Sequence, residues 1–235
     1  MSTTTPRYAF YAAPAAADPL HGFAARWLGY DPDSGESLYS TVPGFDSAWL
    51  ERITAEPRRY GFHATLKPPF RLAEGKDEAS LIKAAVAFAS SFPAVVLPRL
   101  SVEALGRFLA LRPLQPCPGA NRLAADCVRR FDAFRAPAGA AELAKRRAVG
   151  LTARQEAYLT EWGYPYVFDE FRLHFTLTGQ IEDAGTRQRV LDYLKAASAP
   201  VLGDSLMLGE LCLYRQASDG GQFRVLRRFA LAPAE

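Results

Sequence analysis

The sequence predicts an α+β fold in which two similar lobes share one core. Segments with helical periodicity alternate with strand-like segments along the chain. The order strand, helix, strand pair follows His63 and recurs after His174, with no Pro- or Ser-rich linker between the two units. Neither unit is long enough to be an independent domain, so we expect residues 1–235 to form a single bilobal domain.

The first half of the chain is expected to begin with an aromatic strand at residues 8–12. A helix at 19–28 should end at Gly29, and the Asp-Pro, Ser-Gly and Pro-Gly pairs of 31–44 indicate a loop. A second strand at 60–66 should end at Pro68 and Pro69. The other elements expected here are helices at 47–54 and 77–92 and a hairpin of strands at 95–103 and 108–111 that turns near Gly106.

The second half is expected to open with an amphipathic helix at 121–134. Its apolar residues recur at helical spacing, and shorter helices should follow at 140–147 and 152–162. A strand at 171–178 should end at Gly179. The remaining elements are a helix at 186–197 and a hairpin of strands at 205–215 and 222–230, joined by Asp219, Gly220 and Gly221.

Composition and charge suit an ordinary globular protein of the cytoplasm. Hydrophobic residues make up 49% of the chain and charged residues 23%. The three cysteines show no metal-binding or disulfide spacing, and no signal peptide or membrane-length apolar run is present. A net charge of +3 permits an anionic ligand without indicating one. We expect a cytoplasmic monomer with no membrane partner.

Two of the three histidines lie in matching four-residue frames. The first frame is His63-Ala64-Thr65-Leu66 and the second is His174-Phe175-Thr176-Leu177. Two such frames among three histidines arise by accident with a probability of order one in ten thousand. A lone strand histidine is usually structural, but the pairing overrides that reading for His63 and His174. His21 lacks the frame and is expected to be structural or at the surface.

Strand geometry places matching polar groups beside each histidine. Side chains of a strand alternate between its two faces, so residues two apart share a face. The polar face of the first strand then carries Gly61, His63, Thr65 and Lys67, and that of the second carries Arg172, His174, Thr176 and Thr178. The opposite faces are mostly apolar and should pack against helices.

These residue types suit the cleavage of a phosphate ester. One histidine can deprotonate the nucleophile while the other protonates the leaving oxygen, because imidazole titrates near neutral pH. The hydroxyls of Thr65 and Thr176 are placed to bind non-bridging oxygens, and Lys67 and Arg172 to offset the charge of the transition state. The chemistry requires no metal and no cofactor.

Paired His-x-Thr-Leu frames half a chain apart resemble the two-histidine (2H) phosphoesterase superfamily, which includes cyclic phosphodiesterases and RNA end-processing enzymes. The stretches around the frames, from Arg59 to Phe70 and from Trp162 to Gly179, are most similar to one bacterial branch. That branch is associated with phosphonate breakdown and has no established activity (domain of unknown function 1045). The start of the chain, at Arg7 to Tyr11, is similar to it as well.

The resemblance implies two antiparallel sheets that face each other across a central cleft, with helices outside and a pseudo-twofold relation between the lobes. It implies His63 and His174 as catalytic residues and Thr65 and Thr176 as phosphate ligands. We therefore expect metal-independent hydrolysis of a cyclic phosphodiester, either a 2′,3′-cyclic nucleotide or a cyclic ribose phosphate. Tyr60 is a candidate to contact the rest of the substrate, although core packing is its more common use.

Several alternatives remain open at the level of sequence. The same residues would serve an RNA end-processing enzyme, a ligase or an exonuclease, whose longer substrate needs a basic groove. A non-catalytic module that holds a nucleotide or sugar phosphate is a third reading. The sequence does not assign acid and base between the histidines, and the segment 116–150 is a candidate lid over the cleft.

Overall fold

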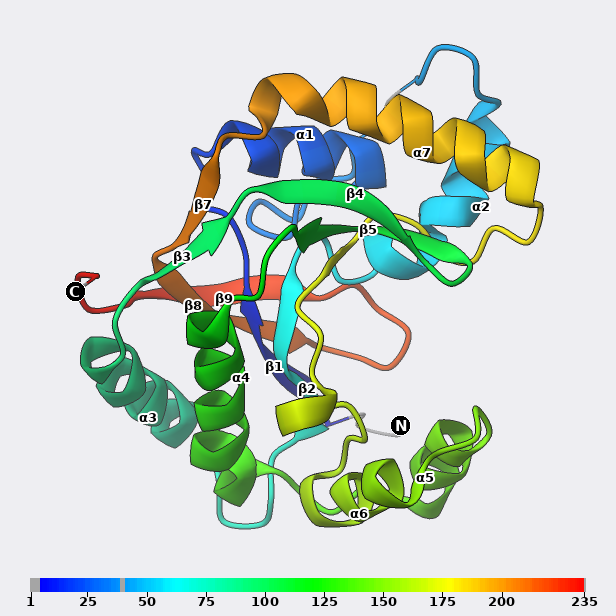
Figure 1. The fold of residues 1–235 in the computed structure, drawn as a ribbon. Helices are drawn as coiled ribbons and strands as arrows, with labels where there is room; N and C mark the ends of the chain where they lie inside the picture. The colour runs from blue at the N-terminus through cyan, green and yellow to red at the C-terminus, as the bar shows by residue number, and fades with distance from the viewer. Residues whose placement is uncertain (1–4, 39–40, 235) are drawn as a thin grey trace.

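The computed structural model describes residues 5–38 and 41–234 and has an α+β fold (Figure 1). The strands are β1 (Arg7–Ala12), β2 (Ala64–Arg71), β3 (Val95–Pro98), β4 (Leu100–Leu105), β5 (Phe108–Pro113), β6 (Phe175–Thr176), β7 (Ser205–Leu208), β8 (Glu210–Gln216) and β9 (Arg224–Ala230). The helices are α1 (Pro19–Leu28), α2 (Ser47–Arg58), α3 (Glu78–Ser91), α4 (Pro118–Phe131), α5 (Ala140–Arg147), α6 (Ala153–Trp162) and α7 (Ala184–Ser198). None of the described helices is both long and apolar enough to cross a bilayer.

The strands form antiparallel sheets, as predicted, and each histidine frame joins a different sheet. A four-stranded sheet has the order β2-β1-β8-β9 and receives the first frame through β2. A three-stranded sheet has the order β4-β5-β6 and receives the second frame through β6. The short pair β3-β7 forms a third sheet. The predicted α+β class with antiparallel sheets is therefore confirmed.

Helices cover the outer faces of these sheets (Figure 1). α3 packs against β8 and β9, α4 packs against β2, and α7 packs against β4 and β5. α4 buries Leu123, Cys127 and Phe131, whose spacing of four residues places them on one side of a helix. Residues 118–131 are thus part of the core, which excludes them from the candidate lid. α5 and α6 lie together at the edge of the molecule (Figure 1).

Both histidine strands begin later than predicted. β2 starts at Ala64, because Gly61 has a left-handed φ of +72° that interrupts an extended run before the histidine. β6 is limited to Phe175 and Thr176, and beyond it the hydroxyl of Thr178 accepts a hydrogen bond from the Leu109 N–H at 2.9 Å. Each histidine therefore lies one residue before its strand.

The prediction that Pro68 and Pro69 end the first histidine strand is wrong. β2 continues through both prolines to Arg71. β2 is an edge strand of its sheet, so the N–H groups that proline lacks are not all needed for pairing.

Two predicted hairpin strands are each divided between sheets. The run 95–103 breaks after Pro98, so that β3 pairs with β7 while β4 pairs with β5. The run 205–215 breaks at Gly209, so that β8 pairs with β1 and β9. Proline lacks a ladder donor and glycine has no side chain to pack, so both residues favour a break in a strand.

The two sheets meet where the histidine frames approach each other. β2 and β6 are in contact, and the rings of Phe62 and Phe175 stack with centroids 5.2 Å apart. The indole N–H of Trp27 donates to the Leu177 carbonyl at 2.8 Å, which fixes the second frame to α1. Packing of apolar neighbours thus brings together the polar side chains on the other side of each frame.

Candidate active site

The two histidines are oriented by the same local hydrogen bond. Nδ1 of His63 lies 2.9 Å from the carbonyl oxygen of Gly61, and Nδ1 of His174 lies 2.7 Å from that of Arg172. A carbonyl oxygen only accepts, so each Nδ1 is the protonated donor. Nε2 of each neutral ring then carries the lone pair and is the atom able to exchange a proton with a ligand.

His63 is enclosed by aromatic rings and by its own threonine. Its ring stacks on Tyr11 with centroids 3.8 Å apart and an interplanar angle of 21°. Tyr60 lies at a centroid distance of 5.8 Å. The hydroxyl of Thr65 is 3.3 Å from Nε2 of His63 and can donate to it. These contacts hold the ring in one orientation.

Burial lowers the pKa of His63 from 6.5 to about 4, and the hydrogen bond to the Gly61 carbonyl acts in the opposite direction. The charge of His174 lowers this pKa further, which is a sign of their proximity. Burial also lowers the pKa of His174; the Arg172 carbonyl opposes this shift, and the positive charge of Arg112 adds to it. Both imidazoles are therefore neutral at neutral pH when no anion is bound.

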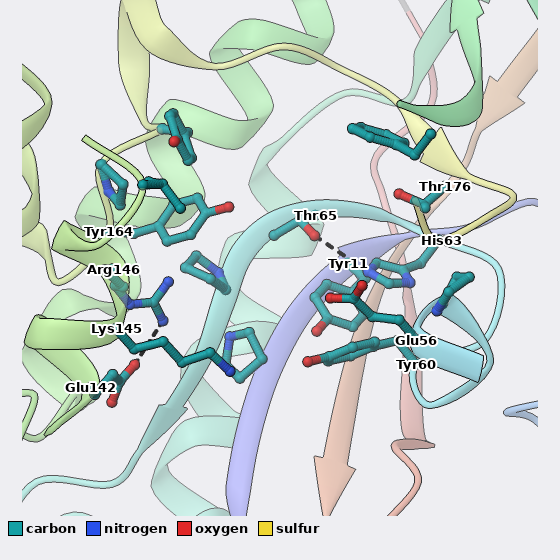
Figure 2. Close-up of a pocket in the computed structure, with 18 of the residues that line it drawn as sticks. Tyr11, Glu56, Tyr60, His63, Thr65, Glu142, Lys145, Arg146, Tyr164 and Thr176 are labelled. Carbon is teal, nitrogen blue, oxygen red and sulfur yellow. Dashed lines mark hydrogen bonds and ion pairs between the residues drawn. The ribbon is translucent and has the colours of Figure 1, made fainter. Parts of the chain in front are cut away.

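Two adjoining cavities lie beside these rings. The larger, of about 800 Å³, is lined by His63, Thr65 and Thr176, and the smaller, of about 300 Å³, is lined by His174 and Thr65. Both are also lined by Pro68, Phe108, Tyr164 and Tyr166. Thr65 therefore stands at the boundary between the spaces that the two histidines line. Figure 2 shows His63, Thr65 and Thr176 on one side of the larger cavity.

Among the secondary candidates from the sequence, Tyr60 lines the larger cavity. Arg172 lines the smaller one beside His174 and donates to the carbonyl oxygens of Asp169 and Phe171 at 2.7 and 2.9 Å. Thr178 also lines the larger cavity, but its hydroxyl is engaged by Leu109.

The prediction that Lys67 shares the histidine face is wrong. Tyr11 is opposite Thr65 in the sheet, whereas the next residue along β1, Phe10, is opposite Lys67, so Leu66 is an extra residue in β2. Such a bulge reverses the alternation of faces. The ammonium group of Lys67 is consequently buried and lies 3.1 Å from Asp132.

Sequence reasoning missed the charged residues on the far side of the larger cavity. Glu142, Lys145 and Arg146 extend from α5 towards the space in front of Tyr60 and Tyr11 (Figure 2). Arg7 and Glu56 complete the charged lining. The helix 140–147 was predicted, but no periodicity indicates which cavity a surface helix borders. The consecutive Lys145-Arg146-Arg147 was the one available signal.

A group with metal-ligand spacing lies elsewhere in the described part of the chain and comprises His21, Asp31 and Asp33. Asp33 makes a bidentate ion pair with Arg228 at 2.7 and 2.8 Å, and Nε2 of His21 lies 3.3 Å from Asp31. The pair with Arg228 offsets the charge of Asp33 and ties the loop after α1 to β9. The arrangement fits the structural role expected for His21.

Comparison with known proteins gives a family and several relatives. A model of the family described as "Protein of unknown function (DUF1045)" matches residues 65–224. Two curated relatives are both named ribose 1,5-bisphosphate phosphokinase PhnN. That of Janthinobacterium sp. (strain Marseille) is 40% identical over 227 residues, and that of Laribacter hongkongensis is 34% identical over 222 residues. Each match covers 94% of this chain but only 50% and 51% of the relatives, so the chain spans about half of their length.

Similar solved structures include E. coli LigT complexed with 3'-AMP, which is 16% identical, with 97% of this chain and 99% of that chain covered and a TM-score of 0.48. The apo form of E. coli LigT is 17% identical, with 97% and 98% covered and a TM-score of 0.47.

Proposed function

The chain belongs to the DUF1045 family, as its two histidine frames predicted, and we propose that it is a metal-independent phosphoesterase that hydrolyses a cyclic phosphodiester. In this proposal His63 and His174 act as general base and general acid. Thr65 and Thr176 bind the phosphate, and Tyr60 contacts the remainder of the substrate. Arg172, beside His174, offsets negative charge that develops in the transition state.

One observation carries the proposal: both rings are fixed in the same tautomer, with the lone pair on Nε2. Each Nδ1 donates to the carbonyl oxygen two residues earlier, at 2.9 and 2.7 Å. A general acid–base pair needs rings with a fixed tautomer and one exchangeable position, which this geometry supplies. A histidine that serves only packing has no need to repeat the arrangement in a second sheet.

The reaction follows from these positions. Nε2 of the base takes a proton from water, whose oxygen attacks phosphorus while the bond from phosphorus to one ring oxygen breaks. The departing oxygen takes a proton from Nε2 of the acid, so a cyclic diester and water give a phosphate monoester and a hydroxyl group. Burial keeps His63 neutral, which favours it as the base. The negative charge of the bound phosphate raises the pKa of both imidazoles, which allows His174 to enter protonated.

The curated relatives suggest the substrate. Their name gives ribose 1,5-bisphosphate as the compound that they phosphorylate, and this chain matches half of their length. Hydrolysis of a cyclic ribose phosphate yields a ribose phosphate monoester, which belongs to the same class of compound as the ribose phosphate in that name. We therefore place a cyclic ribose phosphate ahead of a 2′,3′-cyclic nucleotide.

The test is hydrolysis in EDTA of a panel that includes a ribose 1,2-cyclic phosphate and a 2′,3′-cyclic nucleotide. Turnover should survive the chelator and disappear in His63→Ala and in His174→Ala, while His21→Gln, a change to the histidine outside the cavities, should retain it. Turnover that EDTA abolishes, or that either alanine variant keeps, would overturn the mechanism. Tight binding of these compounds without turnover would favour a binding module, and activity only on RNA ends would favour the end-processing reading.

A further inference from the structure

We propose that α5 carries a second anion-binding subsite, in which Lys145 and Arg146 bind a phosphate monoester on the same substrate molecule. The inference rests on the proposed function, because it places this group across the larger cavity from the phosphate held by the histidines. It narrows the substrate class from any cyclic phosphodiester to one that bears an additional phosphate.

The position of the cations supports the subsite. Figure 2 shows α5 on the side of the cavity opposite His63, with Lys145 directed across it towards Tyr60. A cavity of about 800 Å³ lies within the range of drug-sized ligand sites, roughly 300 to 1,000 Å³, and leaves room beyond a single cyclic phosphate. A substrate that fills it must place a second group near α5.

The charges of the lining favour an anion there. Three permanent cations, Arg7, Lys145 and Arg146, line the larger cavity against two carboxylates, Glu56 and Glu142. One carboxylate is already used, since Glu142 accepts a hydrogen bond from Arg146 at 2.7 Å. The side chain of Lys145 makes no hydrogen bond or ion pair with any residue in the described ranges 5–38 and 41–234. Its ammonium group is therefore available to a ligand.

Arg146 is held in place but not satisfied. Its guanidinium lies over the ring of Tyr164, 4.9 Å from the centroid, and the contact with Glu142 fixes one terminal nitrogen. Its Nε is buried and has no acceptor among the residues that the structure describes. A buried donor without a partner is uncommon in a folded protein and indicates a ligand or water site. An arginine with one end anchored and a free N–H matches the oxygens of a phosphate.

The attachment of α5 suits such a role. The helix has no buried side chain, and Arg147 ties it to α6 through Glu156, whose Oε1 accepts hydrogen bonds from Nη2 at 2.6 Å and from Nε at 2.9 Å. A cavity wall that is held by ion pairs rather than by a core can adjust to a ligand at small cost. Within the candidate lid 116–150, the helix that carries these cations, α5, therefore lies outside the core.

The experiment compares two substrates that differ only in this group, namely ribose 1,2-cyclic phosphate with and without a phosphate on O5. The additional phosphate should raise kcat/KM at least about tenfold, and Lys145→Gln should remove most of this gain while lowering kcat/KM for the simpler substrate much less. Lys83→Gln is the matched control, because Lys83 is an exposed lysine on α3, away from the cavity. Equal use of both substrates by the wild type, or equal slowing of both by Lys145→Gln, would overturn the subsite.

A binding measurement separates the subsite from the chemistry. Ribose 5-phosphate has a monoester and no cyclic ester, so its affinity by calorimetry reports on the subsite even if no cyclic phosphate is hydrolysed. Wild type and His63→Ala should bind it equally, and Lys145→Gln about tenfold more weakly. The same affinity in wild type and Lys145→Gln would refute the subsite, whereas loss of hydrolysis with this difference intact would refute only the proposed catalysis.

Discussion

Protonation of His63 should destabilise the native protein as the pH falls from 6.5 towards 4. Burial gives this residue a lower pKa in the native state than in the unfolded state, so the unfolded chain binds more protons in that interval. The free energy of unfolding therefore decreases as the pH falls below 6.5. Above pH 6.5 the histidine is neutral in both states, so it does not change the stability there.

The size of the effect follows from the two pKa values. A separation from 6.5 to about 4, at about 1.4 kcal/mol for each pH unit, corresponds to a loss of about 3 kcal/mol once His63 is charged in both states. That is a large part of the 5–15 kcal/mol, roughly, that stabilises an ordinary domain.

The assay is urea unfolding of wild type and of His63→Asn at neutral pH and at pH about 4, in buffers without phosphate. Carboxylates and His174 titrate in both proteins, so the difference between the two pH dependences isolates His63. The wild type should lose about 3 kcal/mol more than the variant. Parallel pH dependences, together with imidazole NMR signals of His63 that titrate near 6.5, would refute the reasoning.

Three further predictions concern the residues around the site. Gly61→Ala should lower the free energy of unfolding by about 2 kcal/mol more than Gly75→Ala. Both glycines have a left-handed φ, but only at Gly61 would the added methyl group lie within 2.5 Å of a proline. Equal losses of stability for the two variants in urea would contradict this. Thr65→Val should lower kcat/KM about tenfold to a hundredfold while Thr65→Ser keeps most activity, since we propose that the hydroxyl binds the phosphate; a fully active valine variant would exclude Thr65 from the site. Lys67→Met should lower the free energy of unfolding by about 1 to 3 kcal/mol, because it breaks the buried contact with Asp132, and should leave kcat/KM unchanged. A Lys67→Met variant with reduced kcat/KM and unchanged free energy of unfolding would instead indicate that Lys67 acts on the substrate beside the histidines.

The parts of the fold that follow local rules were predictable from the sequence. α1 was predicted at its observed bounds, and the structure shows two local features that set them: Asp18 caps the first turn and Gly29 closes the last. The two matching histidine frames could be found in the sequence because each consists of four consecutive residues. Their approach to one another depends on Phe62 and Phe175, whose contact no local pattern encodes.

Other features depend on tertiary structure. The bulge at Leu66 places Lys67 on the opposite face of the strand. The pattern of apolar and polar residues before the bulge does not reveal that it is there. The continuation of β2 through two prolines depends on its position at the edge of a sheet. The use of Tyr11 as a stacking partner of His63, and of α5 as a cavity wall, likewise requires the assembled molecule.

The hydrogen bond from each Nδ1 to the carbonyl oxygen two residues earlier has a consequence for how such a site can arise and change. Many catalytic histidines are oriented by a carboxylate from a distant part of the chain, and a single substitution there removes the support. Here the orienting group is main chain, which no side-chain replacement deletes. A segment of about four or five residues then contains both the histidine and the group that orients it. A fold that repeats this segment therefore repeats the orientation of the imidazole as well. Duplication of a short segment is enough to supply both halves of a two-histidine centre, and drift in the surrounding sequence can retune the substrate while the rings keep their orientation.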